Sequence, residues 1–270
     1  MEKRTKYFTF GILTGFGIIA ILISILTITS LVAIISGPNT VAVIPVMGEI
    51  GYGSSKNVTI SHPDAFSQMM DEANNDPRVG AIVLDINSPG GSPVAGEEML
   101  EKVKNSKKPV IARISDTGSS AAYMVASGAD KIVASPSSWV GSIGVILTLG
   151  DLSEYYKKQG INLYSITGGK YKDMGADYRN LTPEEKDMLQ KMVNEEYDHF
   201  IRIIAENRNL SFDYVKKIAE GRPYTGQQGL NNSLVDYLGG KDYAIELAAN
   251  KSNMTYYQVF TYNANSGFGF

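Results

Sequence analysis

The chain contains no cysteine and only two histidines, His62 and His199, among its 270 residues. Without cysteine there can be no disulfide framework, no thiolate metal site and no thiol nucleophile. The scarcity of histidine also leaves few candidates for the usual base of a serine hydrolase. His199 lies four residues after Glu195 in a segment with helical spacing, and His62 precedes a proline at a helix entrance. Both patterns are typical of structural histidines.

Charge is missing from positions 7–48, whereas three basic residues occur among the first six. Within that window, residues 11–35 form an apolar run that is long enough to cross a bilayer core of about 30 Å as a helix. The basic residues before it predict a cytoplasmic N-terminus. A cleaved signal peptide is the alternative, but its apolar core would be only about 7–15 residues long. We therefore expect one N-terminal transmembrane helix, with residues 1–37 as N-terminus and anchor and 38–270 as one extracytoplasmic domain.

Basic residues are not in excess, since the formal net charge is −3. This balance argues against a nucleic-acid partner, which favours a basic face. Glycosylation sequons offer weak support for an external location, because they can carry glycans in a suitable host. They occur at Asn57, Asn180, Asn209, Asn231 and Asn253.

Beyond a cluster of chain breakers at 37–40, unbroken apolar segments alternate with amphipathic ones. The apolar segments predict strands at 41–48, 80–91, 108–115, 130–135, 144–150 and 162–169. The amphipathic segments predict helices at 62–77, 95–106, 119–129, 152–160 and 182–207. This alternation indicates an α/β domain with a mainly parallel sheet and flanking helices.

A glycine pair, Gly90 and Gly91, ends the segment that begins at residue 80. Glycine permits positive φ and lets a backbone N–H approach a ligand closely, as in an oxyanion hole. An ordinary strand-to-helix turn would have the same appearance. A phosphate-binding P-loop is excluded, because the Lys-Ser/Thr pair that closes such a loop is absent.

Two adjacent serines, Ser119 and Ser120, stand where a small-residue helix begins. A serine there would lie beside free helix N–H groups, which stabilise negative charge forming next to them. The amide of Ala121 could then form a two-donor oxyanion hole with that of Gly91. The competing interpretation is a plain helix cap, a position that favours serine.

Lysine is the remaining candidate for a base, and Lys170 and Lys172 follow a predicted strand. A free lysine has a pKa of about 10.4 and is a poor base at neutral pH. Lowering that pKa to about 7–8 requires burial against apolar surface without a carboxylate partner, at a cost of about 4 kcal/mol. Such an amine can replace histidine as base and then as acid. The alternative is an ordinary pair of surface lysines.

These segments together resemble the signal peptide peptidase A family, peptidase family S49. The resemblance covers about residues 40–250 and is carried by "VAVIPVMGEI", "LDINSPGGSP", "SSAAYMVASGADKIVASPSSWVGSIGV", "GGKYKDMG", "LTPEEKDMLQKMVNEEYDHFI" and "VKKIAEGRPYTGQQGLNNSLVDYLGG". It implies a Clp-protease/crotonase-like fold and a membrane-anchored serine endopeptidase that uses a Ser–Lys dyad.

Matched position by position, the resemblance makes Ser120 the nucleophile and Lys172, 52 positions later, the general base. Gly91 matches the oxyanion glycine, and Ser142 in "GSIG" matches a serine that orients the lysine amine. Asp130 and Lys131 fall in a stretch that we interpret as structural.

The chain departs from the family pattern beside the nucleophile. Ala121 and Ala122 stand where glycine is usual, and Ser119 stands where a small non-nucleophilic residue is common. We expect Ser120 rather than Ser119 to react. The local "YK" pattern favours Lys172 over Lys170.

The resemblance further implies cleavage of remnant signal peptides and other apolar peptides, a homo-oligomeric ring, and no cofactor or metal. One alternative is a stomatin-type membrane-protein protease of the same fold, although "GSIG" and the Ser-to-Lys spacing fit it less well. A crotonase-like acyl-CoA enzyme would need neither the anchor nor the dyad. A catalytically inactive membrane quality-control scaffold is the remaining alternative.

Overall fold

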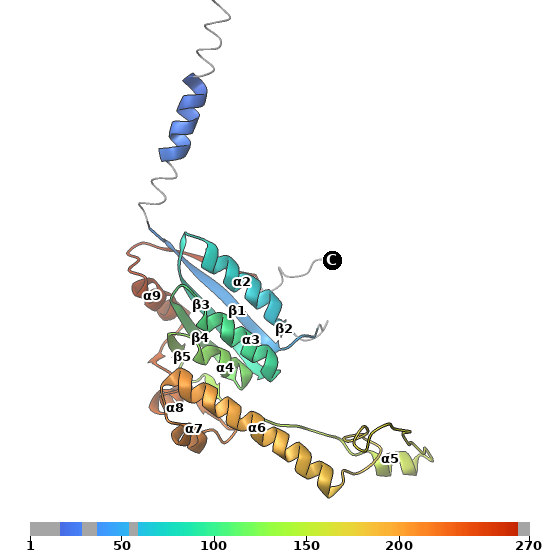
Figure 1. Ribbon diagram of the computed structural model, residues 1–270. Coiled ribbons are helices and arrows are strands. Elements are labelled where there is room, and N and C mark those ends of the chain that lie inside the picture. The colour runs from blue at the N-terminus through green and yellow to red at the C-terminus, as the bar shows by residue number, and fades with distance from the viewer. Residues whose placement is uncertain (1–16, 29–36, 54–58, 264–270) are drawn as a thin grey trace, which may run out of the picture.

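The computed structural model describes residues 17–28, 37–53 and 59–263 (Figure 1). A long sheet forms the centre of the molecule. Its strands are β1 (Thr40–Ile50), β2 (Ile60–Ser61), β3 (Val79–Gly91), β4 (Val110–Ser119), β5 (Lys131–Ala134), β6 (Trp139–Gly141), β7 (Pro223–Thr225), β8 (Tyr237–Leu238) and β9 (Gln258–Thr261). The helices that follow residue 59 are α2 (Pro63–Asn75), α3 (Pro93–Lys104), α4 (Ala121–Ser127), α5 (Ser153–Lys158), α6 (Pro183–Arg208), α7 (Phe212–Ile218), α8 (Gly226–Asn231) and α9 (Lys241–Lys251).

The sheet is parallel except for one short pair. Its main path runs β2-β1-β3-β4-β5-β8, with β9 on the outer edge of β1 and β6 alongside β4. Only β7, which pairs with β6, is antiparallel. The mainly parallel α/β sheet expected from the alternating segments is therefore present.

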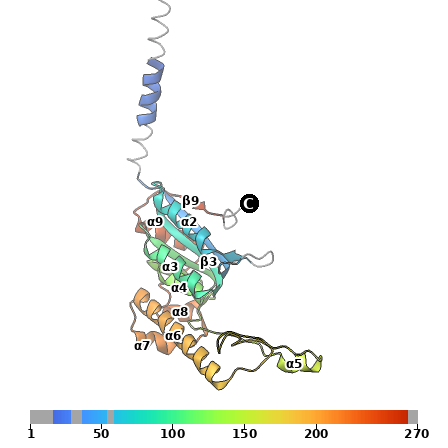
Figure 2. The ribbon, with the colours of Figure 1, turned by 45° about the vertical axis from the view of Figure 1, so that its right-hand side comes forward.

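Both faces of the sheet are covered, which explains why its strands are unbroken apolar runs. Ala42, Ile44 and Val46 of β1 pack into the core beneath α2, α3 and α4, whereas Val41 and Val43 pack against α9. Successive side chains of a strand point to opposite faces, so a strand buried on both sides must be apolar at every position. Figures 1 and 2 show the helices on the two sides.

The helix boundaries follow their local sequence signals. His62 is the N-cap of α2, where its Nδ1 accepts a hydrogen bond from the Asp64 N–H. Thr182 caps α6 and forms a reciprocal capping box with Glu185, as expected for Thr followed three residues later by Glu. The predictions of a helix entrance at His62 and of a long helix after Thr182 are both confirmed.

A long arm, residues 145–182, extends away from the sheet and returns along α6 (Figures 1 and 2). The strands predicted at 144–150 and 162–169 are wrong, because neither segment is a strand. Their apolar side chains face solvent instead of a core, and Ile166 is 95% exposed. These segments have apolar sequences, but no strand in the described part of the chain pairs with them.

The expected membrane anchor lies mostly outside the described residues. Of the apolar run 11–35, residues 17–28 are described, and they are helical. Within the described parts of the chain, no helix has both the length and the apolar character needed to cross a bilayer.

Candidate active site

Ser120 occupies the turn between the end of β4 and the start of α4. Its backbone has φ 54° and ψ −128°, an uncommon conformation for a residue with a side chain. Its N–H donates to the Gly141 carbonyl at 2.8 Å, and its carbonyl accepts from the Met124 N–H at 3.0 Å. Such a conformation costs on the order of 1–3 kcal/mol and tends to occur at functional sites. Ser120 is therefore held in a strained strand-to-helix turn, a setting in which nucleophilic serines of α/β-hydrolases also occur.

The two adjacent serines have different environments. The Ser119 side chain is buried, and its hydroxyl lies 3.1 Å from that of Thr117. Ser120 makes no side-chain capping bond and lines a cavity. The plain-cap interpretation therefore does not describe Ser120, and of the two serines it is the one that lines the cavity.

The glycine pair packs directly against this turn. Gly90 has φ +105°, and a Cβ built on it would lie 2.7 Å from the Ser120 Cβ and 3.0 Å from the Ala121 nitrogen. A Cβ on Gly91, at φ +150°, would lie 2.1 Å from the Ile50 carbonyl oxygen. Only glycine fits at either position. The structure thus brings the Gly91 segment and the Ala121 amide, the two predicted oxyanion donors, to the same side of Ser120.

The cavity at Ser120 has a volume of about 630 Å³, within the usual size range of ligand sites. Its walls come from the end of β3, the turns after β4 and β6, α6, and the segment before β7. The lining residues are Pro89, Gly91, Ser120, Ser142, Gly144, Val145, Ile146, Gln190, Val193, Asn194, Tyr197, Ala219, Glu220 and Gly221.

Ser142 lies in this cavity, directly after the residue whose carbonyl holds the Ser120 amide. It has φ +48°, and its hydroxyl donates to the Gly221 carbonyl at 2.9 Å. Within one chain, the Ser142 hydroxyl therefore bonds to the Gly221 carbonyl and not to a lysine amine. The role of orienting a lysine amine stays a prediction.

Lys172 is not brought to Ser120 within one chain. It is exposed on the arm and is absent from the residues that line the cavity. It forms no ion pair with any residue that the structure describes. Lys170 differs, because its amine lies 2.7 Å from Glu184 and is also close to Tyr171, and these contacts raise its pKa. Of the two candidate bases, only Lys172 lacks a carboxylate partner.

The turn that carries Lys172 lies beside an ion-pair cluster in which Glu185 is buried and Arg179 and Asp173 are half-buried. Arg179 contacts Asp173 at 2.8 Å and Glu185 at 2.7 Å. Because Asp173 is bound to Arg179, the acidic neighbour of Lys172 is not available to neutralise it. Hydrogen bonds from Arg179 and from the Thr182 amide lower the pKa of Glu185 to about 2. The cluster therefore stays charged at neutral pH and orders the backbone around Lys172.

The remaining residues singled out in the sequence have structural contacts. His199 on α6 lies 3.0 Å from Glu97 and does not line the Ser120 cavity. Asp130 accepts the Val110 N–H at 2.7 Å, and Lys131 pairs with Asp236 at 3.1 Å. These contacts agree with the structural interpretation of all three residues.

Sequence reasoning missed the contribution of α6 to the cavity. Gln190, Asn194 and Tyr197 form one wall, and Gln190 donates to Asn194 at 2.9 Å. Their spacing of four and three residues places them on one helix face. This face could have been read from the sequence, but nothing there indicated that it meets the turn after β4.

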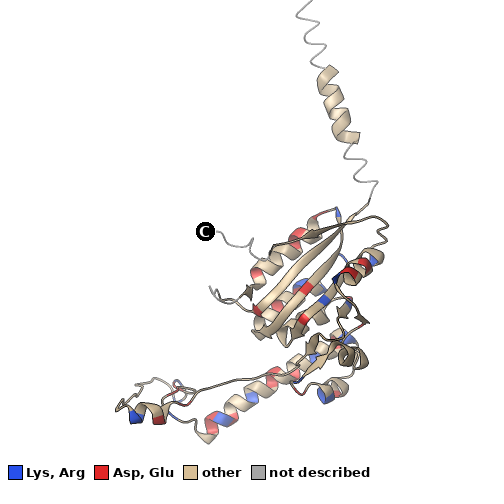
Figure 3. Ribbon diagram, turned by 180° about the vertical axis from the view of Figure 1, so that it is seen from behind, with Lys and Arg blue, Asp and Glu red and all other residues tan. Residues whose placement is uncertain are grey.

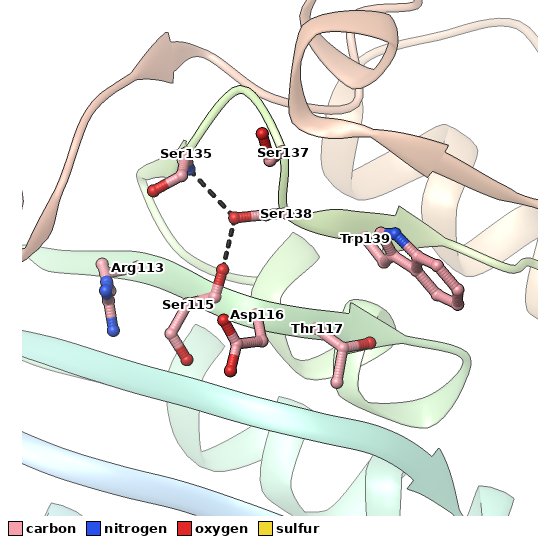
Figure 4. A pocket seen from close by; sticks show the side chains of 8 residues that line it. All are labelled: Arg113, Ser115, Asp116, Thr117, Ser135, Ser137, Ser138 and Trp139. Atoms are coloured by element: carbon pink, nitrogen blue, oxygen red, sulfur yellow. Dashed lines mark hydrogen bonds between the residues drawn. The ribbon is translucent and has the colours of Figure 1, made fainter.

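A second cavity, of about 420 Å³, opens where β5 and β6 pair with successive parts of β4 (Figure 4). The Ser138 hydroxyl bridges its two sides, accepting from the Ser135 N–H and donating to the Ser115 carbonyl. The lining residues are Arg113, Ser115, Asp116, Thr117, Ser135, Ser137, Ser138 and Trp139. None of the predicted catalytic residues lines this cavity.

Known proteins resemble the chain in both sequence and fold. A protein of Methanocaldococcus jannaschii that is named as a protease is 40% identical over 209 residues, 76% of this chain and 66% of its own length. A protein of Enterococcus faecium that is named as a signal peptide peptidase is 31% identical over 75% of this chain and 60% of its own length. The chain therefore spans about two thirds or less of the length of these relatives.

Solved structures show the fold. The 1510-N membrane-bound stomatin-specific protease has a TM-score of 0.56 at 18% identity, over 84% of this chain and 98% of its own. ClpP1 of Listeria monocytogenes has a TM-score of 0.50 at 15% identity, over 75% and 94%. The expected Clp-protease-like sheet is thus confirmed. The model of peptidase family S49 matches residues 102–255, which include Ser120, Ser142 and Lys172. On this match and the sequence identity above, the chain belongs to peptidase family S49.

Proposed function

We propose that the protein is a membrane-anchored serine endopeptidase whose Ser–Lys dyad is completed between two copies of the chain. One observation carries the proposal. Ser120 is held in a strained turn at a cavity, while Lys172 is exposed on the arm and pairs with no carboxylate among the described residues. The serine half of the site is complete in one chain, and the lysine half requires a second surface.

A second copy would supply the environment that Lys172 needs. An exposed ammonium keeps its charge, and burial against apolar surface is what lowers a lysine pKa towards neutrality. The arm is rich in exposed apolar side chains, with Ile146, Tyr164 and Ile166 the most exposed. Exposed apolar surface on this scale is typical of a protein–protein interface. Packing of one arm on the next copy would desolvate the amine and bring it to a neighbouring Ser120.

The reaction then follows from the positions of these groups. Neutral Lys172 takes the hydroxyl proton as the Ser120 Oγ attacks a peptide carbonyl. The oxyanion accepts hydrogen bonds from the Gly91 and Ala121 amides. Lys172 returns its proton to the leaving amine, and the carbon–nitrogen bond breaks. Lys172 next removes a proton from water as the water oxygen attacks the acyl carbon. The bond from that carbon to the Ser120 Oγ breaks, and Lys172 returns the proton to the Oγ, which restores the hydroxyl and releases the carboxylic acid product.

The cavity and the N-terminal sequence indicate the substrate class and the location. Val145, Ile146 and Val193 give the cavity an apolar wall suited to apolar peptide side chains. The apolar run 11–35 would hold the enzyme in the cell membrane, with its N-terminus cytoplasmic and its catalytic domain outside. We therefore assign remnant signal peptides and other apolar membrane peptides as substrates, in line with the name of the Enterococcus faecium relative.

Mixing two inactive variants tests the shared dyad directly. Ser120→Ala and Lys172→Ala chains, each inactive alone, are co-expressed in equal amounts. If each site uses Ser120 of one copy and Lys172 of the next, random assembly restores about a quarter of the wild-type sites. If the dyad lies within one chain, the mixture stays inactive. A fluorophosphonate label located on Ser120 by mass spectrometry identifies the nucleophile, with Ser119→Ala as the control that should still be labelled.

A further inference from the structure

One end of the sheet lies opposite Ser120. It carries the loops that precede the parallel strands, including residues 37–39, which lead into β1. Because β1, β3, β4 and β9 are parallel, their amino ends lie together. We call this region the tether end and define it by Asn39, Arg78, Lys107 and the segment 253–257. Figures 1 and 2 show residues 37–39, which lead into β1, at this end of the domain.

Two tyrosines lie at the tether end beside the exit of the chain. Gln258 donates its N–H to the Asn39 carbonyl at 2.8 Å, so the residues just before Gln258 lie next to the last residues before β1. These are Tyr256, which is 87% exposed, and Tyr257. Tyrosine joins an apolar ring to a polar hydroxyl, which suits the boundary between a membrane and water.

Basic groups share this end. The Arg78 carbonyl accepts the N–H groups of Asn39 and Thr40 at 2.9 and 3.0 Å, which places Arg78 at the exit. Its guanidinium is exposed and pairs with Asp76. Lys107 is exposed in the loop before β4 and forms no ion pair with any described residue. Tyrosine rings are enriched at the lipid headgroup level, and long basic side chains can extend their charges to the same level.

The tether leaves little room between this end and a membrane. Five peptide steps separate Ile35, the last residue of the apolar run, from Thr40. Fully extended, they span at most about 17 Å. If the run crosses the bilayer, the first residue of β1 is held close to the headgroups, and so are the tyrosines beside it.

We propose that the tether end rests on the bilayer, with Tyr256 and Tyr257 in the headgroup region and Lys107 near anionic lipid phosphates. The proposal depends on the membrane anchor of the proposed function and adds the orientation of the domain. β3 has 13 residues, so its far end, at the Ser120 site, stands about 40 Å from the tether end. Peptide segments therefore reach Ser120 only after they have left the bilayer.

Tryptophan quenching tests this orientation in the full chain. The single tryptophan, Trp139, is 60% exposed and lies beside Thr117 near the carboxyl end of β4. Its own emission is therefore the matched control. A second protein carries Trp139→Phe and Tyr256→Trp. Both proteins are reconstituted in nanodiscs of phosphatidylcholine and phosphatidylglycerol, with either brominated or ordinary acyl chains.

We expect brominated lipid to reduce the emission of a tryptophan at position 256 at least about twofold, as for a ring at the membrane interface, and to leave Trp139 emission unchanged. Equal, weak quenching of both positions would overturn the proposal. So would a blue-shifted but unquenched signal at position 256, which would indicate that a second copy covers the tyrosines. Vesicle flotation separates the two proposals: a chain that does not float overturns the anchor and this inference together, whereas a floating chain without quenching overturns only the inference.

Discussion

The sheet domain and the arm use similar apolar residues with opposite results. In β1 and β3 most apolar side chains are fully buried, because each of these two strands has neighbouring strands on both sides and helices on both faces. In the arm, Tyr164 and Ile166 are almost fully exposed. Yet each region carries one half of the predicted dyad. Under the proposed function, the geometry of the nucleophile is set by local packing, whereas the chemistry of the base is set by assembly.

The largest expected effect concerns the dyad itself. Ser120→Ala and Lys172→Ala should each reduce peptide hydrolysis by at least about 1,000-fold, because removal of either member leaves only binding and oxyanion stabilisation. Lys172→Arg should be equally inactive, since a guanidinium does not lose its proton in proteins. Steady-state hydrolysis of a fluorogenic apolar peptide measures these losses.

Lys170→Ala is the matched control on the arm. Lys170 pairs with exposed Glu184, and an exposed pair contributes about 0–1 kcal/mol to stability. This variant should keep most of the wild-type rate. If Lys172→Arg retained activity, Lys172 would act through its charge and not as a base.

The next effect concerns the exposed face of the arm. Tyr164→Asp combined with Ile166→Asp should weaken assembly by at least about 100-fold, because charged groups would be placed in an apolar interface. The hydrolysis rate should fall in parallel as the copies separate. Analytical ultracentrifugation across a concentration series measures the assembly.

The melting temperature of the separated chain provides the control for this variant. Both side chains face solvent within one chain, so the fold itself should be unaffected. An unchanged sedimentation coefficient in the double variant would show that the arm face is not an interface, and the difference between arm and domain would then need another cause.

The same contrast explains which parts of the structure could be predicted from the sequence. Sequence signals predicted the central strands, the turn glycines and the capped helix α6. These signals are local, because each of these elements is buried or capped by residues of the same chain. The structure of segments 144–150 and 162–169 could not be predicted. Their apolar runs predict burial, but they do not indicate whether the covering surface belongs to the same chain or to another molecule. For Lys172, the partner surface that we propose lies outside a single chain, so no pattern in the sequence could supply it.

Glycine substitutions sharpen the comparison at the backbone level. Gly91→Ala should destabilise the domain by about 2 kcal/mol and reduce activity about tenfold, because its Cβ would meet the Ile50 carbonyl at 2.1 Å. Gly168→Ala on the arm should be neutral, since no atom lies within 4 Å of its Cβ. Urea denaturation and hydrolysis assays measure both variants. Equal losses in the two would mean that the arm is as tightly packed in the working protein as the sheet.

The smallest expected effect concerns the cluster that shapes the Lys172 turn. Hydrogen bonds from Arg179 hold the pKa of Glu185 at about 2, below its ordinary value of 4.5. A carboxylate with a depressed folded-state pKa stabilises the protein above its unfolded pKa, and the contribution is lost as pH falls through the folded value. Glu185→Gln should therefore lower the melting temperature by a few degrees at pH 7. The difference from wild type should shrink as pH falls from about 4.5 towards 2.

Glu184→Gln, one residue earlier in the same helix turn, is the matched comparison. Its carboxylate is exposed and pairs with Lys170, so its loss should change the melting temperature by much less at every pH. Scanning calorimetry at several pH values between 2 and 7 separates the two variants. If both gave the same small shift at pH 7, the Arg179 cluster would not order the arm, and the position of Lys172 would depend on the neighbouring copy alone.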